Sequence, residues 1–116
     1  MSTILLVEDD EILRENTAEL LRELGHLVVE AASAEAAMLL LNEGQRADIL
    51  LTDIGLPGES GEVFAAEARA LRPGLRIVFV TGRGSVPDAS GEGFSPLLLR
   101  KPFSMEELSA ALARAR

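Results

Sequence analysis

The stretch "ILLVEDDEIL", residues 4–13, joins an apolar run to four consecutive acidic residues and then to the start of an amphipathic segment. The run Ile4–Val7 is continuous rather than alternating, which is typical of a strand buried on both faces of a parallel sheet. Acidic residues that follow such a strand fall at its carboxyl end, where ligands bind in open parallel sheets. The stretch therefore predicts a strand, a helix and a polar site between them.

Four further apolar runs of similar length follow along the chain. They lie at Leu27–Val29, Ile49–Leu51, Ile77–Val80 and Leu97–Leu99. The segments between them have helical spacing, except for residues 82–96, where four glycines and two prolines allow at most a turn or two of helix. This order of elements predicts a doubly wound α/β fold around a parallel sheet.

Capping residues and apolar stripes mark the four expected helices. Ser33 can cap the second helix, and Ser104-x-x-Glu107 is a capping box for the last. Largely apolar stripes predict the buried faces of the first and third helices. The stripes are Leu13, Thr17, Leu20, Leu21 and Leu24 in the first, and Phe64, Ala68 and Leu71 in the third. Helices on both faces leave the rim of the sheet as the place where polar groups meet.

Length and composition fit one globular domain of 116 residues. A net charge of -8 disfavours direct contact with nucleic acid or an anionic membrane. The chain has no cysteine, which excludes thiolate metal sites and fits the reducing cytoplasm. No apolar run approaches the length of a membrane span. We therefore expect a cytoplasmic protein.

Chemically active side chains follow four of the five expected strands. In chain order they are Glu8, Asp9 and Asp10, then Asp53, then Thr81, then Lys101, the only lysine. Taken singly, each acid is better explained by a helix cap or a first-turn charge, and Thr81 and Lys101 could simply be a turn and a solvated strand end. Together they form a set suited to phosphoryl transfer, with carboxylates for Mg²⁺, a hydroxyl and an ammonium for phosphoryl oxygens, and Asp53 as the nucleophile.

Four segments, "ILLVEDD", "LLTDIGLPGESG", "IVFVTG" and "LLLRKPFS", together resemble the receiver domain of bacterial two-component response regulators. The resemblance covers essentially the whole chain, so residues 1–116 are expected to form a single receiver domain. It implies a flavodoxin-like, five-stranded parallel sheet in the order 2-1-3-4-5. It also implies a phosphoacceptor switch, not an enzyme in the usual sense, that catalyses its own phosphorylation and dephosphorylation.

The resemblance assigns roles to individual residues. Asp53 would accept the phosphoryl group from a histidine kinase phosphohistidine and also bind Mg²⁺, with the backbone carbonyl of Gly55 as a further ligand. Thr81 would reorient toward the phosphoryl group, and Lys101 would pair with it. Pro57 and Gly61 would shape the loop after Asp53.

The acidic pair of the family can be placed in two ways. Alignment on Leu13-Arg14 and the spacing to Asp53 favour Glu8 and Asp9, with Asp9 bound to Mg²⁺ directly and Glu8 through water. Asp10 and Glu11 would then sit at the start of the first helix and favour its dipole. The alternative pair, Asp9 and Asp10, remains open.

Two departures from the family pattern affect the output surface. Leu98 occupies the position of the usual switch aromatic, and residues 82–96 fall where a fourth helix is expected. The second feature is similar to a receiver subset that has a Phe-x-Thr-Gly motif, here Phe79 to Gly82, and a loop in place of that helix. We therefore expect helix 4 to be short or replaced by a loop, and the usual dimerisation mode to be altered, leaving a monomer or weak dimer.

The expected partners are a histidine kinase or phosphotransfer protein and an unidentified downstream protein, within a two-component phosphorelay. Residues Met1-Ser2-Thr3 favour a stand-alone receiver, although the same sequence could also be the receiver module of a hybrid histidine kinase. A non-transferring scaffold and a small phosphatase are the competing classes. The retained site residues argue against the first, and Gly55, where such phosphatases place a second acid, argues against the second. His26, a lone histidine at a strand start, is expected to be structural.

Overall fold

A parallel sheet forms the middle layer of the structure, which is a computed structural model. The structure describes residues 2–54, 61–81, 97–100 and 103–114. Of these, residues 81 and 97–100 are described by their backbone alone. Strands and helices follow in the order β1 (Thr3–Val7), α1 (Glu11–Glu23), β2 (Leu27–Ala31), α2 (Ala34–Asn42), β3 (Ile49–Asp53), α3 (Gly61–Leu71), β4 (Arg76–Thr81), β5 (Leu97–Arg100) and α4 (Met105–Arg114). The sheet order is β2-β1-β3-β4-β5, with every pair parallel. The predicted doubly wound fold is confirmed.

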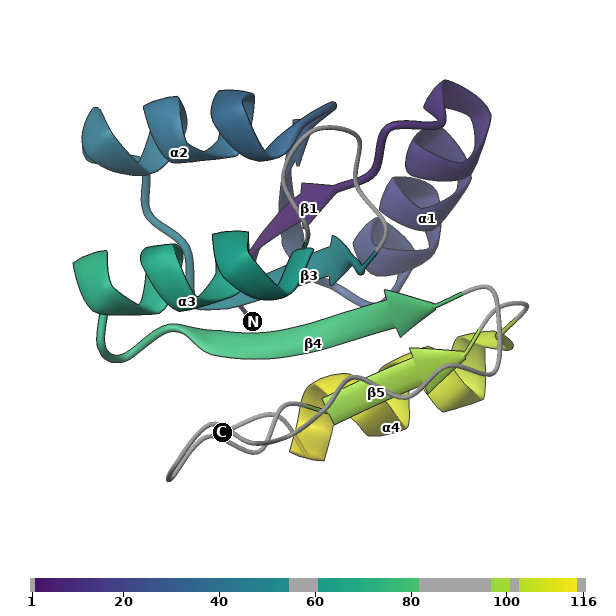
Figure 1. Cartoon of the computed structure of the whole chain (residues 1–116). Helices are drawn as coiled ribbons and strands as arrows, with labels where there is room; N and C mark the ends of the chain where they lie inside the picture. The colour runs from purple at the N-terminus through teal and green to yellow at the C-terminus, as the bar shows by residue number, and fades with distance from the viewer. Residues whose placement is uncertain (1, 55–60, 82–96, 101–102, 115–116) are drawn as a thin grey trace.

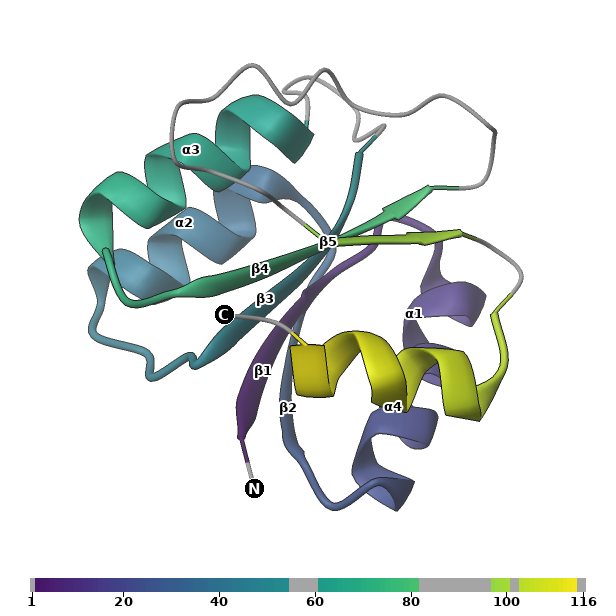
Figure 2. The same cartoon turned by 90° about the horizontal axis from the view of Figure 1, so that it is seen from below.

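Helices cover both faces of this sheet (Figure 1). Helices α2 and α3 lie on one face, and α1 and α4 lie on the other, as Figure 2 shows. Successive side chains along the inner strands alternate between the two cores: Leu5 and Val7 of β1 pack toward α2 and α3, whereas Ile4 and Leu6 pack toward α1 and α4. Burial on both faces explains why the apolar runs are continuous.

The sequence pattern overestimated burial at three places. β2 is an edge strand, and Leu27 at its start is exposed. Leu13 and Leu71, which the stripes placed on buried faces, are also exposed. Both lie in terminal turns, Leu13 near the start of α1 and Leu71 at the end of α3. Helical periodicity identifies a face, but it does not show where the covering sheet ends.

Side-chain caps fix the helix starts as predicted. Asp10 is the N-cap of α1, and its Oδ1 accepts the Leu13 N–H at 3.1 Å. Ser33 caps α2 in the same way. The capping box of α4 is complete, because Ser104 Oγ accepts the Glu107 N–H at 3.0 Å while Glu107 Oε1 accepts the Ser104 N–H at 2.9 Å. Each cap satisfies amide groups that have no partner within the helix.

Two expectations about helices remain, one on helix 4 and one on membrane spans. The expectation about helix 4 falls on residues 82–96, which lie outside the described residues. Among the helices that the structure describes, none combines the length and the apolar character required to cross a membrane.

Two leucines of α2 provide a test of this packing. Leu41 is 2% exposed in the core beneath α2 and α3, whereas Leu39 on the same helix is 63% exposed. Leu41→Ala should lower the free energy of unfolding by about 2–5 kcal/mol, since it removes buried methylenes and leaves a cavity. The same substitution at Leu39 should change it by less than about 0.5 kcal/mol. Urea denaturation followed by circular dichroism measures both, and equal losses would contradict the described placement of α2.

Candidate functional site

The register of β1 against β3 places acidic residues side by side at the carboxyl edge of the sheet. Val7 pairs with Thr52, so the residues that follow them lie beside each other: Glu8, directly after β1, and Asp53, at the end of β3. Because side chains alternate along a strand, both fall on the face of the sheet opposite to that of Val7. Asp9 follows Glu8 at the start of the turn into α1.

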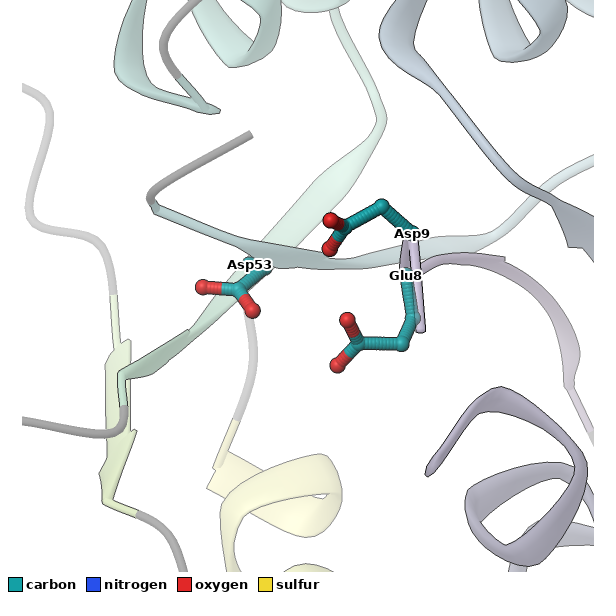
Figure 3. Close-up of side chains that lie close together, drawn as sticks. All are labelled: Glu8, Asp9 and Asp53. Carbon is teal, nitrogen blue, oxygen red and sulfur yellow. The ribbon is translucent and has the colours of Figure 1, made fainter. Parts of the chain in front are cut away.

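Three carboxylates converge at this edge. One side-chain oxygen from each of Glu8, Asp9 and Asp53 lies within 4.8 Å of the others. Figure 3 shows Glu8 and Asp9 beside each other at the end of β1, with Asp53 across from them. Glu8 is 6% exposed, Asp53 is half-buried and Asp9 is exposed. The cluster thus reaches from the protein interior to solvent.

Backbone hydrogen bonds hold the first strand end in place. The Glu8 N–H donates to the Ala31 carbonyl at 3.1 Å, which ties it to the end of β2. The Glu8 carbonyl accepts from Arg14 Nη1 at 3.0 Å. The Glu8 carboxylate is also oriented, because its Oε2 accepts the Asp10 N–H at 3.2 Å. In the sequence, Arg14 stands out only as part of the Leu13-Arg14 pair, which does not predict this contact.

The second strand end is held in a similar way. The fully buried Thr52 donates its hydroxyl to the Asp53 carbonyl at 3.1 Å, and the Ile54 N–H donates to the Val80 carbonyl at 3.1 Å. The first of these bonds was also missed, although a threonine directly before a site aspartate is a visible signal. Asp53 therefore projects from backbone that is fixed on both sides.

Asp10 and Glu11 play a different part from Glu8 and Asp9. Asp10 caps α1 through its side chain, and Glu11 lies in the first turn of that helix. Their predicted position at the helix start is confirmed. The described metal-type cluster contains Glu8 and Asp9 and does not contain Asp10. Which pair binds a cation stays a prediction, and the geometry favours Glu8 and Asp9.

The remaining predicted site residues are described only in part or not at all. Thr81 ends β4, and its backbone pairs with Arg100, the residue before Lys101. The ends of β4 and β5 therefore lie at the same edge of the sheet as Asp53. Lys101, Gly55 and Pro57 lie outside the described residues.

The donor chemistry of the cluster fits a hard divalent cation. Its ligands are all carboxylate oxygens, which Mg²⁺ and Ca²⁺ prefer over nitrogen or sulfur. Carboxylates this close repel each other in the absence of a counter-charge, so a cation bound among them removes that repulsion. The exposed Asp9 leaves room for water or phosphate oxygens in the coordination shell, as Mg²⁺ usually requires. Glu8, Asp9 and Asp53 are therefore the residues that would hold such an ion.

Gly61 allows α3 to start directly against the Asp53 backbone. Its N–H donates to the Ile54 carbonyl at 2.8 Å. A Cβ at this position would overlap the Asp53 carbonyl oxygen and lie 2.9 Å from the Ile54 Cα. Only glycine permits this approach. The predicted role of Gly61 in shaping the chain after Asp53 thus has a physical basis.

His26 lies at the other end of the sheet. It directly precedes β2, and its Nδ1 accepts the Ser2 N–H at 3.3 Å. This contact joins the starts of β1 and β2, far along both strands from the carboxylates. The structural role expected for His26 is consistent with this placement.

Comparisons with known proteins agree with this geometry. Residues 4–113 match the family model of the response regulator receiver domain. The two-component response regulator PhoP of Pseudomonas aeruginosa is 35% identical over 94% of this chain and 49% of its own length. The sensor kinase CckA of Brucella abortus is 31% identical over 96% of this chain and 12% of its own length. The chain thus spans less than half the length of either relative.

Solved structures extend the likeness to the fold. A response regulator receiver protein from Sinorhizobium medicae has a TM-score of 0.88 and 31% identity, with 97% of this chain and 92% of that chain covered. The response regulator TrrA of Thermotoga maritima, solved in complex with Mg²⁺ and BeF, has a TM-score of 0.87 and 27% identity over 98% of both chains.

Two glycines give a matched test of the contact between α3 and Asp53. Gly61→Ala should lower the free energy of unfolding by about 1–3 kcal/mol, because the new methyl group forces backbone apart. It should also shift the amide NMR signals of Asp53 and Ile54. A Cβ at Gly74, in the turn after α3, meets no atom within 4 Å, so Gly74→Ala should leave both unchanged or stabilise slightly. Equal behaviour of the two variants would contradict the close approach.

Proposed function

The chain belongs to the receiver domain family of two-component response regulators, and from this premise we propose that Asp53 accepts a phosphoryl group from a phosphohistidine of a histidine kinase or phosphotransfer protein. We also propose that residues 1–116 form a single receiver domain. The observation that carries the proposal is the convergence of Asp53 with Glu8 and Asp9, whose oxygens lie within 4.8 Å of one another at the carboxyl edge of the sheet. The Asp53 carboxylate would thereby serve both as the nucleophile and as a ligand of the cation.

The transfer step follows from the chemistry of the two groups. An Asp53 carboxylate oxygen attacks the phosphorus atom, and the bond between phosphorus and the imidazole nitrogen of the donor breaks. The electron pair of that bond stays on the imidazole, which takes up a proton, and Asp53 becomes an acyl phosphate. Mg²⁺, when bound, neutralises charge that develops on the phosphoryl oxygens. The part of the protein is chiefly to position Asp53 and to supply compensating charge.

Other residues of the chain complete the proposed site. The Lys101 ammonium would pair with a phosphoryl oxygen as a point charge, and the Thr81 hydroxyl would donate a hydrogen bond to another. The Gly55 carbonyl, together with Glu8 and Asp9, would contribute to the Mg²⁺ site. Support comes from the placement of Thr81 and Arg100 at the same sheet edge as Asp53. Further support comes from the hydrogen bonds that fix the backbone on both sides of Asp53 at this edge of the sheet.

Dephosphorylation reverses the switch. Water attacks the phosphorus atom, the bond between phosphorus and the Asp53 oxygen breaks, and inorganic phosphate leaves. We propose that the chain catalyses both steps on itself and signals in the cytoplasm through contacts with a downstream protein. Such a cycle needs no output activity within residues 1–116, because the signal is the change in surface between the two states.

A beryllofluoride titration tests the acceptor role. With Mg²⁺ present, beryllofluoride should bind Asp53 as a phosphoryl mimic and shift amide NMR signals around the carboxyl edge of the sheet. Asp53→Asn should abolish these shifts, because the amide is a poor ligand for beryllium. Asp10→Asn removes the same charge close by and keeps a good N-cap, so its response should match that of the unmodified chain. A response that survives in Asp53→Asn would contradict the proposal.

A matched pair of variants tests the register of the acidic residues. Asp9→Asn should lower Mg²⁺ affinity at least about 10-fold, a loss found even for residues that only support a metal ligand. Asp10→Asn changes the net charge equally and should leave the affinity within about twofold, since an exposed charge that is not a ligand is screened. Calorimetric titration with Mg²⁺ measures both. A loss of affinity in Asp10→Asn as large as that in Asp9→Asn, or larger, would instead assign the site to the alternative pair, Asp9 and Asp10.

A further inference from the structure

One side chain of α1 links the carboxylate cluster to the edge strand. Arg14 donates from Nη1 to the Glu8 carbonyl at 3.0 Å, and its Nε lies 3.5 Å from Oε1 of Glu30 on β2. The Arg14 side chain is only 18% exposed, and that of Glu30 is 29% exposed. Partial burial weakens solvent screening, so this pair is stronger than a typical surface ion pair. The guanidinium is thus fixed between β2 and the end of β1.

The carbonyl that Arg14 holds belongs to the peptide between Glu8 and Asp9. This peptide joins the two Cα atoms that carry the Glu8 and Asp9 side chains, so a change in the backbone torsion angles beside it would change the direction of one side chain relative to the other. The Glu8 N–H is already fixed by the Ala31 carbonyl at 3.1 Å. Arg14 supplies the matching restraint on the carbonyl side. The Arg14 N–H, in turn, donates to the Asp10 carbonyl at 2.9 Å, so backbone and side chain of one residue hold the whole turn.

We propose that Arg14, oriented by Glu30, is a positioning residue for the cation site, which fixes the Glu8–Asp9 peptide so that both carboxylates face Asp53. The inference rests on the proposed function, since it concerns the same Mg²⁺ site. Arg14 touches no reacting atom. Its effect on the cation passes through the direction of the Glu8 and Asp9 side chains.

The two contacts of Arg14 require a guanidinium. Its nitrogens lie in one plane with fixed directions, so Nη1 can reach a carbonyl while Nε faces a carboxylate. The lysine ammonium is a single charged centre on a flexible stem and does not hold two acceptors in this fixed geometry. Arg14→Lys therefore keeps the charge of the chain and removes the restraint.

Arg22 provides an internal control. It lies on the same helix and pairs with the same glutamate, with Nη2 3.2 Å from Glu30 Oε2. Its side chain is 51% exposed, and no contact of Arg22 with the Glu8–Asp9 peptide is among those the structure describes. Arg22→Lys therefore perturbs the Glu30 pair and leaves the contact between Arg14 and Glu8 in place.

The test compares Mg²⁺ affinity among the whole chain and its variants by ¹H–¹⁵N NMR titration, because the chain contains neither tryptophan nor tyrosine to report binding by fluorescence. Arg14→Lys should lose about 10-fold in affinity, as expected when a residue that supports metal ligands is replaced. Glu30→Gln should lose less, since Arg14 keeps its carbonyl contact. Arg22→Lys should bind Mg²⁺ as the unmodified chain does.

Amide hydrogen exchange in Mg²⁺-free protein gives a second readout. Faster exchange at Glu8 and Asp10 in Arg14→Lys, without the same change in Arg22→Lys, would support the restraint directly. If the unmodified chain and Arg14→Lys bind Mg²⁺ equally well, the role of Arg14 is overturned and the proposed function is not. If the unmodified chain binds no Mg²⁺, both the proposed function and the role of Arg14 at the cation site are overturned. Should Arg14→Lys fail to fold, Glu30→Gln is compared with Arg22→Lys by the same two measurements. A loss of Mg²⁺ affinity and faster exchange in Glu30→Gln alone would support the role of Arg14, and equal behaviour of the two variants would overturn it.

Discussion

Parallel pairing of β1 with β3 is the constraint on which the rest of the structure depends. The register that sets Val7 against Thr52 also sets Glu8 beside Asp53, two residues that lie 45 positions apart in the chain. A slip of one residue in either strand would send its side chains to the opposite face. It would therefore exchange the two cores and separate the carboxylates at the same time. Core packing and site geometry are fixed by one set of hydrogen bonds.

The apolar strands allow the protein to hold carboxylates close together. Alternate side chains of β1 are buried beneath different helix pairs, so the central strands cannot move apart without exposing both cores. Glu8, Asp9 and Asp53 gather at the end of this rigid sheet, where the Asp10 N–H orients the Glu8 carboxylate and backbone hydrogen bonds hold the strand ends. The packing of the sheet thus maintains an arrangement of carboxylates that fits a hard cation.

Sequence reasoning succeeded where the signal is local or topological. Continuous apolar runs identified the strands, caps identified the helix starts, and the rule for parallel sheets brought Asp53 to the acids that follow β1. It failed at Leu13 and Leu71, because helical periodicity describes a face without showing how far the neighbouring layer extends. It failed at Leu27, because an apolar run does not show that its strand lies at the edge of the sheet. It also missed the contacts of Arg14 and the approach of α3 to Asp53. Those depend on distances between segments, which no spacing along the chain contains.

The four acids after β1 divide between two kinds of structure within one short turn. Glu8 still follows the strand, because its N–H bonds to β2 and its side chain continues the alternation. Asp10 already caps the helix, because its carboxylate accepts the Leu13 N–H, a first-turn amide with no partner within the helix. Asp9 lies between these two anchors, so its direction is set by the peptides on either side of it. A change from strand to helix across three residues is therefore what turns an acidic run into a buried carboxylate, an exposed carboxylate and a helix cap, and only the first two face Asp53.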